Sequence, residues 1–201
     1  NFKFNSKNNS IYFQNYCDVQ DTSIGWITGA QVCYCAEAFP TVDSFHDDAP
    51  LLAVLGEVLK WGHLHPSIRE KGGAYGAGAI QDSSNKIFKF YSYRDPRCMD
   101  TFDDFMKSRE WSLKKITQEQ LDEGILGVIS NIDKPLSPYG EAINDFSNIL
   151  NNNNQEKRAD FRSKVKECSL NDLINVSRKY LFNESKRSVI AGENYTDEMK
   201  K

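Results

Sequence analysis

Alternating apolar and polar positions predict β-strands in the first half of the chain and near its end. The most regular alternation covers residues 87–93, where Phe88, Phe90 and Ser92 would share one face of a strand. The side chains expected on the opposite face are Lys89, Tyr91 and Tyr93. Four further segments have strand-like composition: residues 11–16, 26–37, 77–81 and 186–191.

Apolar residues at a spacing of three and four predict helices elsewhere in the chain. The first helix would begin at Asp47 and Asp48, where acidic residues precede an early proline, and would reach about His63. The apolar positions of this helix are Leu51, Leu52, Leu55, Val58 and Leu59. Their spacing predicts one buried face along its length.

Capping residues mark several helix starts in the second half of the chain. Thr117 and Gln120 have the spacing of a capping box, in which each side chain bonds the backbone N–H of the other residue. Helices are expected to begin near residues 99, 117, 137 and 169. The Asn-rich residues 151–154 are expected to form a loop between two of them.

Strands combined with segregated helices predict an α+β fold, with a mainly antiparallel sheet and helices packed on one face. The length of 201 residues is typical of one domain. We therefore expect residues 1–201 to form a single domain, with residues 1–10 as a linker or disordered segment. Because the sequence starts at Asn1 with a run of polar residues, we expect it to be a piece of a longer protein.

Composition narrows the function classes. The formal net charge of −3 argues against a surface that binds nucleic acid. No apolar run approaches the roughly 20 residues that a membrane helix needs, so neither nucleic acid nor a membrane is an expected partner. The five cysteines are an odd number and match no disulfide framework. Cys33 and Cys35 are expected to be small buried side chains, and a reducing intracellular compartment is expected.

Residues 68–78 form a glycine-rich stretch that carries the most specific chemistry in the chain. Arg69 and Tyr75 flank Gly72 and Gly73. Glycine lets another backbone approach closely, tyrosine offers a neutral O–H donor, and arginine offers a permanent cation with a rigid fork of donors. Such a pair suits a peptide carbonyl or a developing oxyanion.

The residues alone leave two other interpretations of this stretch open. The first is a helix-to-strand turn with an exposed, ion-paired arginine. The second is a phosphate-binding loop, which is disfavoured because phosphate loops run from a strand through glycines into a helix. Here the predicted helix precedes the glycines and the predicted strand follows them.

The histidines do not predict a metal site. The chain holds three of them, and the pair most suggestive of a metal ligand set is His63 and His65. On a helix, residues two apart point to different faces, whereas zinc pairs on helices lie three or four apart. No third ligand is evident and no His-x-x-Glu-His or His-Glu-x-x-His motif is present, so no metal is expected on this chain.

Three blocks of sequence resemble a known family. Residues 68–76 read Ile-Arg-Glu-Lys-Gly-Gly-Ala-Tyr-Gly and are similar to the signature in the last domain of presequence proteases. These are pitrilysin/insulinase-like metallopeptidases, in the branch that includes falcilysin-type enzymes. Residues 92–96, Ser-Tyr-Arg-Asp-Pro, match a second stretch of that branch, and residues 134–138 match a third more weakly. The resemblance covers about residues 26–191 and has no counterpart for the start of the chain or the Asn-rich loop.

The resemblance implies a site shared between domains. Four homologous α+β domains would form two halves around a peptide chamber, with zinc bound by the first domain of the full-length enzyme. By motif position, Arg69 and Tyr75 would be the catalytic residues that this last domain supplies. Tyr75 would bond the scissile carbonyl and its oxyanion, and Arg69 would hold the substrate backbone. Gly72, Gly73 and Ala74 would contact the substrate.

The resemblance also implies partners. The substrates would be peptides, such as cleaved targeting peptides, and the partner would be the N-terminal half of the same protein. The chain alone would be inactive, and the compartment would be a mitochondrion, another organelle or the bacterial cytoplasm. The alternative is a non-catalytic scaffold or peptide-binding domain of a degenerate relative. In either case, apolar residues near the first helix and the glycine-rich turn are expected to be exposed where a neighbouring domain would cover them.

Overall fold

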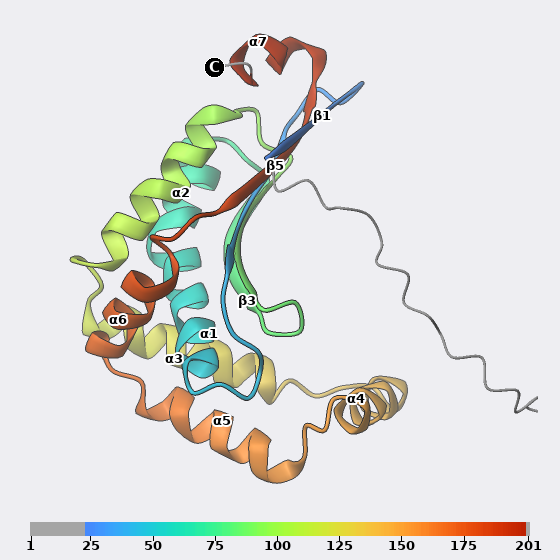
Figure 1. Ribbon diagram of the computed structural model, residues 1–201, viewed down its shortest axis with the longest axis vertical. Coiled ribbons are helices and arrows are strands. Elements are labelled where there is room, and N and C mark those ends of the chain that lie inside the picture. Colours follow the sequence, from blue (N-terminus) through green and yellow to red (C-terminus); the bar gives the residue numbers. More distant parts are fainter. Residues whose placement is uncertain (1–22, 200–201) are drawn as a thin grey trace, which may run out of the picture.

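The described part of the chain is built around one five-stranded sheet. The computed structural model describes residues 23–199 (Figure 1), so the predicted strand at residues 11–16 and the predicted linker at residues 1–10 lie outside the described residues. The strands are β1 (Ile24–Thr28), β2 (Tyr34–Pro40), β3 (Gly76–Asp82), β4 (Ile87–Tyr93) and β5 (Lys186–Gly192). Their order is β1-β5-β2-β4-β3, and every neighbouring pair is antiparallel except β1 with β5. The predicted α+β class with a mainly antiparallel sheet is confirmed.

The predicted strand over residues 26–37 is wrong in one respect, because it is two strands that are not neighbours. β5 lies between β1 and β2 and pairs with both. The chain must therefore cross over the end of β5, and it does so close to Gly192, where a Cβ atom would lie 2.0 Å from the carbonyl oxygen of Ala30. The composition of the segment is strand-like throughout, so it does not reveal the break.

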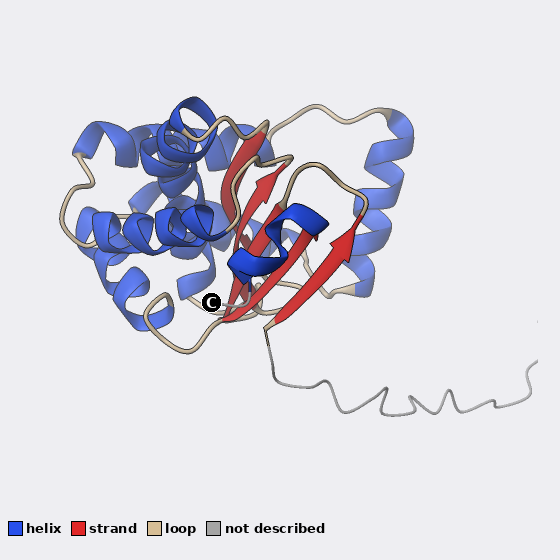
Figure 2. Ribbon diagram, turned by 90° about the horizontal axis from the view of Figure 1, so that it is seen from above, coloured by secondary structure: helices blue, strands red, loops and turns tan. Residues whose placement is uncertain are grey.

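The two faces of the sheet differ as the alternation in β4 predicts. Phe88, Phe90 and Ser92 are buried beneath the helices, whereas Tyr91 and Tyr93 are exposed on the other face. Figure 2 shows most of the helices gathered on one side of the strands. The largest fully buried side chains are Phe39, Phe88, Phe90, Phe105, Leu52, Leu55, Leu59, Leu64, Ile68, Leu121, Leu173 and Leu181.

The helices begin near where their capping residues predict. They are α1 (Asp48–Leu59), α2 (Met99–Ser112), α3 (Gln118–Ile132), α4 (Pro138–Leu150), α5 (Gln155–Glu167), α6 (Leu170–Tyr180) and α7 (Thr196–Met199), with a 3₁₀ turn, η2 (Glu193–Tyr195). Complete capping boxes are present at Thr117 and Ser169. None of the helices within residues 23–199 has both the length and the apolar character needed to cross a bilayer.

The first helix is longer than predicted. It does not end near His63 but continues from α1 into a π-helix, η1 (Lys60–Lys71). Pro66 lies inside η1, and a proline ring clashes with the carbonyl four residues earlier in an α-helix. The wider winding relieves that clash, and the hydroxyl of Ser67 donates to the carbonyl of His63 at 2.7 Å. The proline therefore changes the winding instead of ending the helix.

The helix α4 stands apart from the helical layer. None of its residues is buried, and Figures 1 and 2 both place it beyond the sheet, on the side away from the other helices. Its apolar side chains are therefore in the open, including Phe146 and Ile149. The expectation that helices pack on one face holds for the layer around α1 and not for α4.

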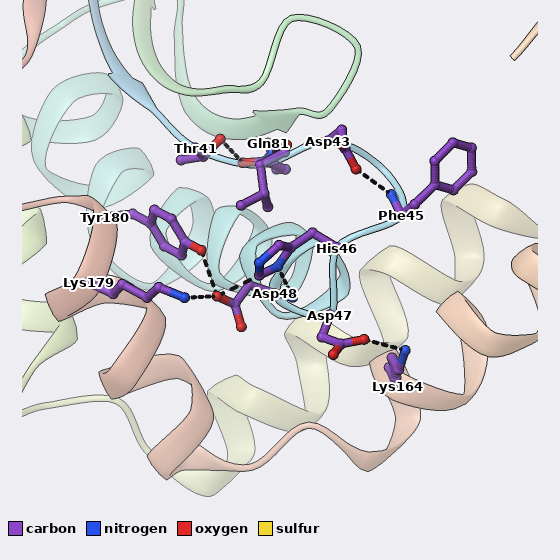
Figure 3. Close-up of polar contacts among 11 residues, drawn as sticks. Thr41, Asp43, Phe45, His46, Asp47, Asp48, Gln81, Lys164, Lys179 and Tyr180 are labelled. Atoms are coloured by element: carbon purple, nitrogen blue, oxygen red, sulfur yellow. Dashed lines mark hydrogen bonds and ion pairs between the residues drawn. The ribbon is translucent and has the colours of Figure 1, made fainter.

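A polar cluster fixes the start of α1 (Figure 3). The carboxylate of Asp48 accepts hydrogen bonds of 2.6 Å from both Lys179 and the hydroxyl of Tyr180, which lie on α6. Asp47 accepts a hydrogen bond of 2.8 Å from Lys164 on α5. These contacts tie three helices together at one point, and we assign the cluster a structural role.

Four of the cysteines are buried free thiols: Cys33, Cys35, Cys98 and Cys168. Cys33 and Cys35 share the buried face, as expected from their spacing of two. Burial raises the pKa of the Cys33 thiol to about 12, with a smaller contribution from neighbouring Cys98. These side chains therefore act as small apolar groups in the core.

Candidate functional site

The glycine-rich stretch forms a tight turn that joins η1 to β3. Gly72 is the C-cap of η1, and the amide of Gly73 donates to the carbonyl of Arg69 at 3.1 Å. The amide of Ala74 donates to the carbonyl of Ile68, also at 3.1 Å. Hydrogen bonds within the turn thus fix the backbone between Arg69 and Tyr75, and this fixes the directions in which the two side chains project.

Each glycine of the turn meets a different constraint. Gly73 has a φ of +80°, a conformation that residues with a Cβ adopt at a cost. Gly72 has an ordinary φ of −81°, but a Cβ atom there would lie 2.1 Å from Nη2 of Arg97. Both positions therefore require glycine, one for its conformation and the other for space.

Arg69 lies in the last turn of η1 and is exposed. Its Nη1 is 3.0 Å from Nε2 of His65, one turn earlier on the helix. A guanidinium only donates hydrogen bonds, so Nε2 accepts and the ring proton lies on Nδ1, which is 3.4 Å from the carboxylate of Glu70. His65 thereby steadies an arginine that otherwise points into solvent.

Tyr75 extends from the end of the turn and is 69% exposed. Its ring meets the ring of Tyr93 edge to face, with 5.7 Å between centroids, and Tyr93 meets Tyr34 in the same way at 5.5 Å. Within residues 23–199, no group forms a hydrogen bond with the Tyr75 hydroxyl. The contact with Tyr93 therefore orients the ring of Tyr75, while the hydroxyl remains available to donate a hydrogen bond.

The stretch at residues 92–96 lies directly against the glycine turn. The carbonyl of Arg94 accepts a hydrogen bond of 3.4 Å from the amide of Tyr75. Asp95 is fully buried, and its carboxylate accepts from the amide of Arg97 at 3.0 Å and from the hydroxyl of Thr101 at 2.7 Å. Asp95 therefore pins the turn, and the two sequence blocks form one structural unit.

Ala74, Gly72 and Gly73 do more to close the turn than to offer free groups to a substrate. Ala74 is buried, and the amides of Gly73 and Ala74 already bond carbonyls within the turn. Their direct contact with substrate stays a prediction. His65, Tyr93 and Arg97 were not expected at the site, because the contacts that bring them there depend on the winding of η1 and on the pairing of β3 with β4.

The described histidines do not lie together as a zinc site would require. His63 packs on Trp111, with ring centroids 5.8 Å apart, whereas His65 faces Arg69. Burial lowers the pKa of His63 and thereby favours its neutral imidazole. Over the part of the chain that the structure describes, no three His, Cys, Asp or Glu side chains group as a metal site would require.

Large apolar side chains are exposed around the site, as expected for a surface that a neighbouring domain or a ligand covers. Those near the first helix and the glycine turn are Trp61, Tyr75, Ile80, Tyr91 and Tyr93. Trp61 also lies 5.2 Å from the ring of His65, measured between ring centroids. The exposed surface thus extends from η1 to the open face of β3 and β4.

Comparison with known proteins identifies the family. The family model for the presequence protease (PreP) C-terminal domain matches residues 27–191. Over 163 residues the chain is 39% identical to the mitochondrial presequence protease of Drosophila melanogaster, and over 162 residues it is 38% identical to that of Yarrowia lipolytica. Each match covers 80% of this chain, but only 15% and 16% of the respective relatives. The chain thus spans about one sixth of the length of the curated relatives.

Solved structures agree on the fold. A protease from Helicobacter pylori matches with a TM-score of 0.70 at 17% identity, over 86% of this chain and 44% of that one. A peptidase M16 inactive domain from Pseudomonas fluorescens matches with a TM-score of 0.65 at 17% identity, over 85% and 43% of the two chains. The fold, the glycine turn with its Arg69 and Tyr75, and the match over residues 27–191 agree: the chain belongs to the presequence protease C-terminal domain family.

Proposed function

We propose that this chain is the C-terminal, substrate-contacting domain of a zinc metalloendopeptidase that degrades peptides, including cleaved targeting peptides. The observation that carries the proposal is the Tyr75 side chain, which is exposed and held by its ring while its hydroxyl has no partner among the described residues. A donor left free in this way is arranged for a group that arrives from outside the chain.

Tyr75 supplies the hydrogen bond that matters most in the proposed reaction. Its neutral O–H donates to the scissile carbonyl, and the bond strengthens as that oxygen becomes an oxyanion in the tetrahedral intermediate. Interactions that strengthen in the transition state raise kcat, whereas uniform binding lowers KM. Tyr75 is therefore expected to act mainly on kcat.

Arg69 holds the backbone of the peptide beside that bond. Its guanidinium has five donors, and the contact with His65 engages Nη1. The remaining donors can bond peptide carbonyls. This contact is made in the ground state as well as in the transition state, so Arg69→Ala is expected to raise KM more than it lowers kcat.

Zinc would supply Lewis-acid chemistry at a site outside this chain, because the described residues do not fit the ion. The N-terminal half of the same protein is the proposed source of that site, and the isolated chain would be inactive. The relatives are named mitochondrial presequence proteases, and this likeness supports the proposal of a mitochondrial location for the parent protein.

The direct test is Tyr75→Phe in the full-length protein, followed by cleavage of a quenched fluorescent peptide. Losing one oxyanion donor lowers kcat roughly 100- to 1,000-fold in other hydrolases, and zinc content should stay at the wild-type level. Tyr139→Phe on α4 is the matched control, because that tyrosine is also exposed and lies outside the site. A wild-type rate for Tyr75→Phe would leave the non-catalytic peptide-binding domain as the better account.

A second measurement compares this chain alone with the full-length protein, with and without a chelator. Cleavage only by the full-length protein, abolished by the chelator, is expected. Chelator-sensitive cleavage by the chain alone would contradict the assignment of zinc to another part of the protein.

A further inference from the structure

The guanidinium of Arg97 lies beneath the glycine turn and is held from two sides. Its Nη1 donates to the carboxylate of Asp104 on α2 at 3.0 Å. On the other side, its Nε is 3.6 Å from the carboxylate of Asp95, an ion-pair distance. Both acids are largely or wholly buried. The planar guanidinium is therefore fixed in one orientation, which a single ion pair at the surface would not achieve.

Two nitrogens of this guanidinium, Nε and Nη2, are buried and have no hydrogen-bond partner among the described residues. Buried donors left unpaired cost free energy, and a well-packed apolar side chain of similar volume often replaces a buried charge without loss. Arg109 also has a buried Nε without a hydrogen-bond partner, so this feature alone assigns no role, and the contact of Nη2 with Gly72 is what sets Arg97 apart. A buried polar group of this kind calls for a separate explanation.

The position of Nη2 suggests one. It lies against Gly72, so that a Cβ atom at residue 72 would be 2.1 Å from it and 2.5 Å from the carbonyl oxygen of Ile68. The carbonyl end of a helix carries partial negative charge, and η1 ends here. The cation thus stabilises the last turn of η1, from which Arg69 projects.

Residues 94–96, which directly precede Arg97, support the end of the glycine turn that leads into Tyr75. Pro96 contacts Gly73, with its Cγ 3.5 Å from where a Cβ would stand, and the carbonyl of Arg94 holds the amide of Tyr75. Residues 94–97 thereby pack against the backbone between Arg69 and Tyr75 and support it along its length.

We infer that Arg97 is a positioning residue for Tyr75 and Arg69 in the proposed peptide hydrolysis. It acts through the backbone at Gly72, and it influences the substrate only through the side chains of Tyr75 and Arg69. The inference rests on the proposed function. Lysine cannot replace it, because an ammonium on a flexible stem lacks the planar fork that meets Asp95 and Asp104 together.

The test is a double-mutant cycle in the full-length protein, with kcat and KM measured for Arg97→Lys, Tyr75→Phe and the combination. Small displacements of a catalytic group lower rates by up to about 100-fold, so we expect Arg97→Lys to lower kcat at least about tenfold through Tyr75 and to raise KM through Arg69. If Arg97 acts on kcat through Tyr75, the double variant should have a kcat no lower than that of Tyr75→Phe alone. Losses that multiply in the double variant, or a wild-type kcat for Arg97→Lys, would overturn the inference.

Arg109→Lys is the matched control for a merely structural loss. Arg109 is a buried arginine on α2 whose Nε likewise lacks a hydrogen-bond partner, but its guanidinium faces Glu37 and the carbonyl of Leu181, away from the turn. It should lower the melting temperature and leave kcat near wild type. A kcat loss equal to that of Arg97→Lys would count against a specific role for Arg97.

Asp104→Asn provides the same test through a milder change, should Arg97→Lys fail to fold. It keeps the size of the partner and removes its charge, so a smaller loss of kcat that again disappears in the Tyr75→Phe background is expected. An unchanged rate for Tyr75→Phe would refute the proposed function itself. A slow Tyr75→Phe with independent losses from Arg97→Lys would refute only this inference.

Discussion

The ring of Tyr75 meets the ring of Tyr93 edge to face, with planes at 73°. An aromatic pair of this geometry contributes about 0.5–1.5 kcal/mol beyond the area it buries. Because Tyr75 is otherwise exposed, this contact is the main restraint on the direction of its hydroxyl.

Removing the ring of Tyr93 should therefore loosen Tyr75 without removing its donor. We expect Tyr93→Ala to lower kcat of the full-length protein, but by less than Tyr75→Phe. Tyr93→Phe keeps the ring and should stay near wild type. Steady-state kinetics of the two variants checks this, and an equal loss in both would show that the hydroxyl of Tyr93 acts directly.

The polar cluster at the start of α1 should contribute to the free energy of unfolding. Tyr180→Phe removes one hydrogen bond to the carboxylate of Asp48, and bonds to charged groups contribute about 1.5–3 kcal/mol. Urea unfolding at pH 7 measures the change. Ser163→Ala on α5 removes a hydroxyl whose hydrogen bond, to Glu167, is exposed, and it should change the unfolding free energy far less.

The same cluster should weaken in acid. Burial would raise the pKa of Asp48, but the hydrogen bonds from Lys179 and Tyr180 outweigh it and lower that pKa below its ordinary 3.8. The folded state thus binds this proton less readily than the unfolded state. The contribution of Asp48 is complete above pH 3.8 and is lost as the pH falls through the lowered pKa. Asp48→Asn should remove that part of the acid dependence, and an unchanged dependence would contradict the prediction.

His63 should make stability fall at mildly acidic pH. Burial disfavours its cation and lowers its pKa from 6.5, so the unfolded chain takes up the proton first as the pH falls. Its contribution is complete above pH 6.5 and decreases below it, until the lowered pKa of the folded state is reached. Urea unfolding between pH 8 and pH 5 should show this slope in the wild type and a flatter one in His63→Gln. The same slope in both proteins would assign the effect to other groups.

The apolar face of α4 should contribute little to the stability of this chain by itself. Phe146 is 60% exposed and Phe105 is fully buried. Phe105→Ala should cost about 3–5 kcal/mol, whereas Phe146→Ala should stay within about 0.5 kcal/mol of wild type, as a surface change does. Urea unfolding of both variants gives the comparison, and a loss above about 1 kcal/mol for Phe146→Ala would show that α4 is packed within the chain.

The sequence was sufficient for features that depend on neighbours along the chain. The alternation of residues 87–93 gave the faces of β4, and the side chains of Thr117 and Ser169 gave two helix starts. The glycine turn was also predictable. The positive φ of Gly73 favours glycine at that position whatever the rest of the fold does, so the requirement is visible in the local sequence.

The sequence was not sufficient where a distant segment decides the outcome. The break before β2 follows from the insertion of β5 between two strands that are close in sequence. The contact of Arg97 with Gly72 depends on how β4 and α2 meet the end of η1. The position of α4 follows from no pattern within its own residues, since its apolar spacing is typical of a helix that packs on its core.

The π-helical winding of Lys60–Lys71 makes this segment sensitive to its length rather than to its composition. A π-helical turn is an α-helical turn that accommodates an additional residue. If one residue ahead of Arg69 were deleted and the winding stayed as it is, every later residue of the helix would turn around the helix axis by an amount close to the roughly 100° per residue of an α-helix. Arg69 would then point in a different direction, although its spacing from Tyr75 along the chain would be unchanged. A relative with such a deletion would keep every letter of the motif and lose its geometry.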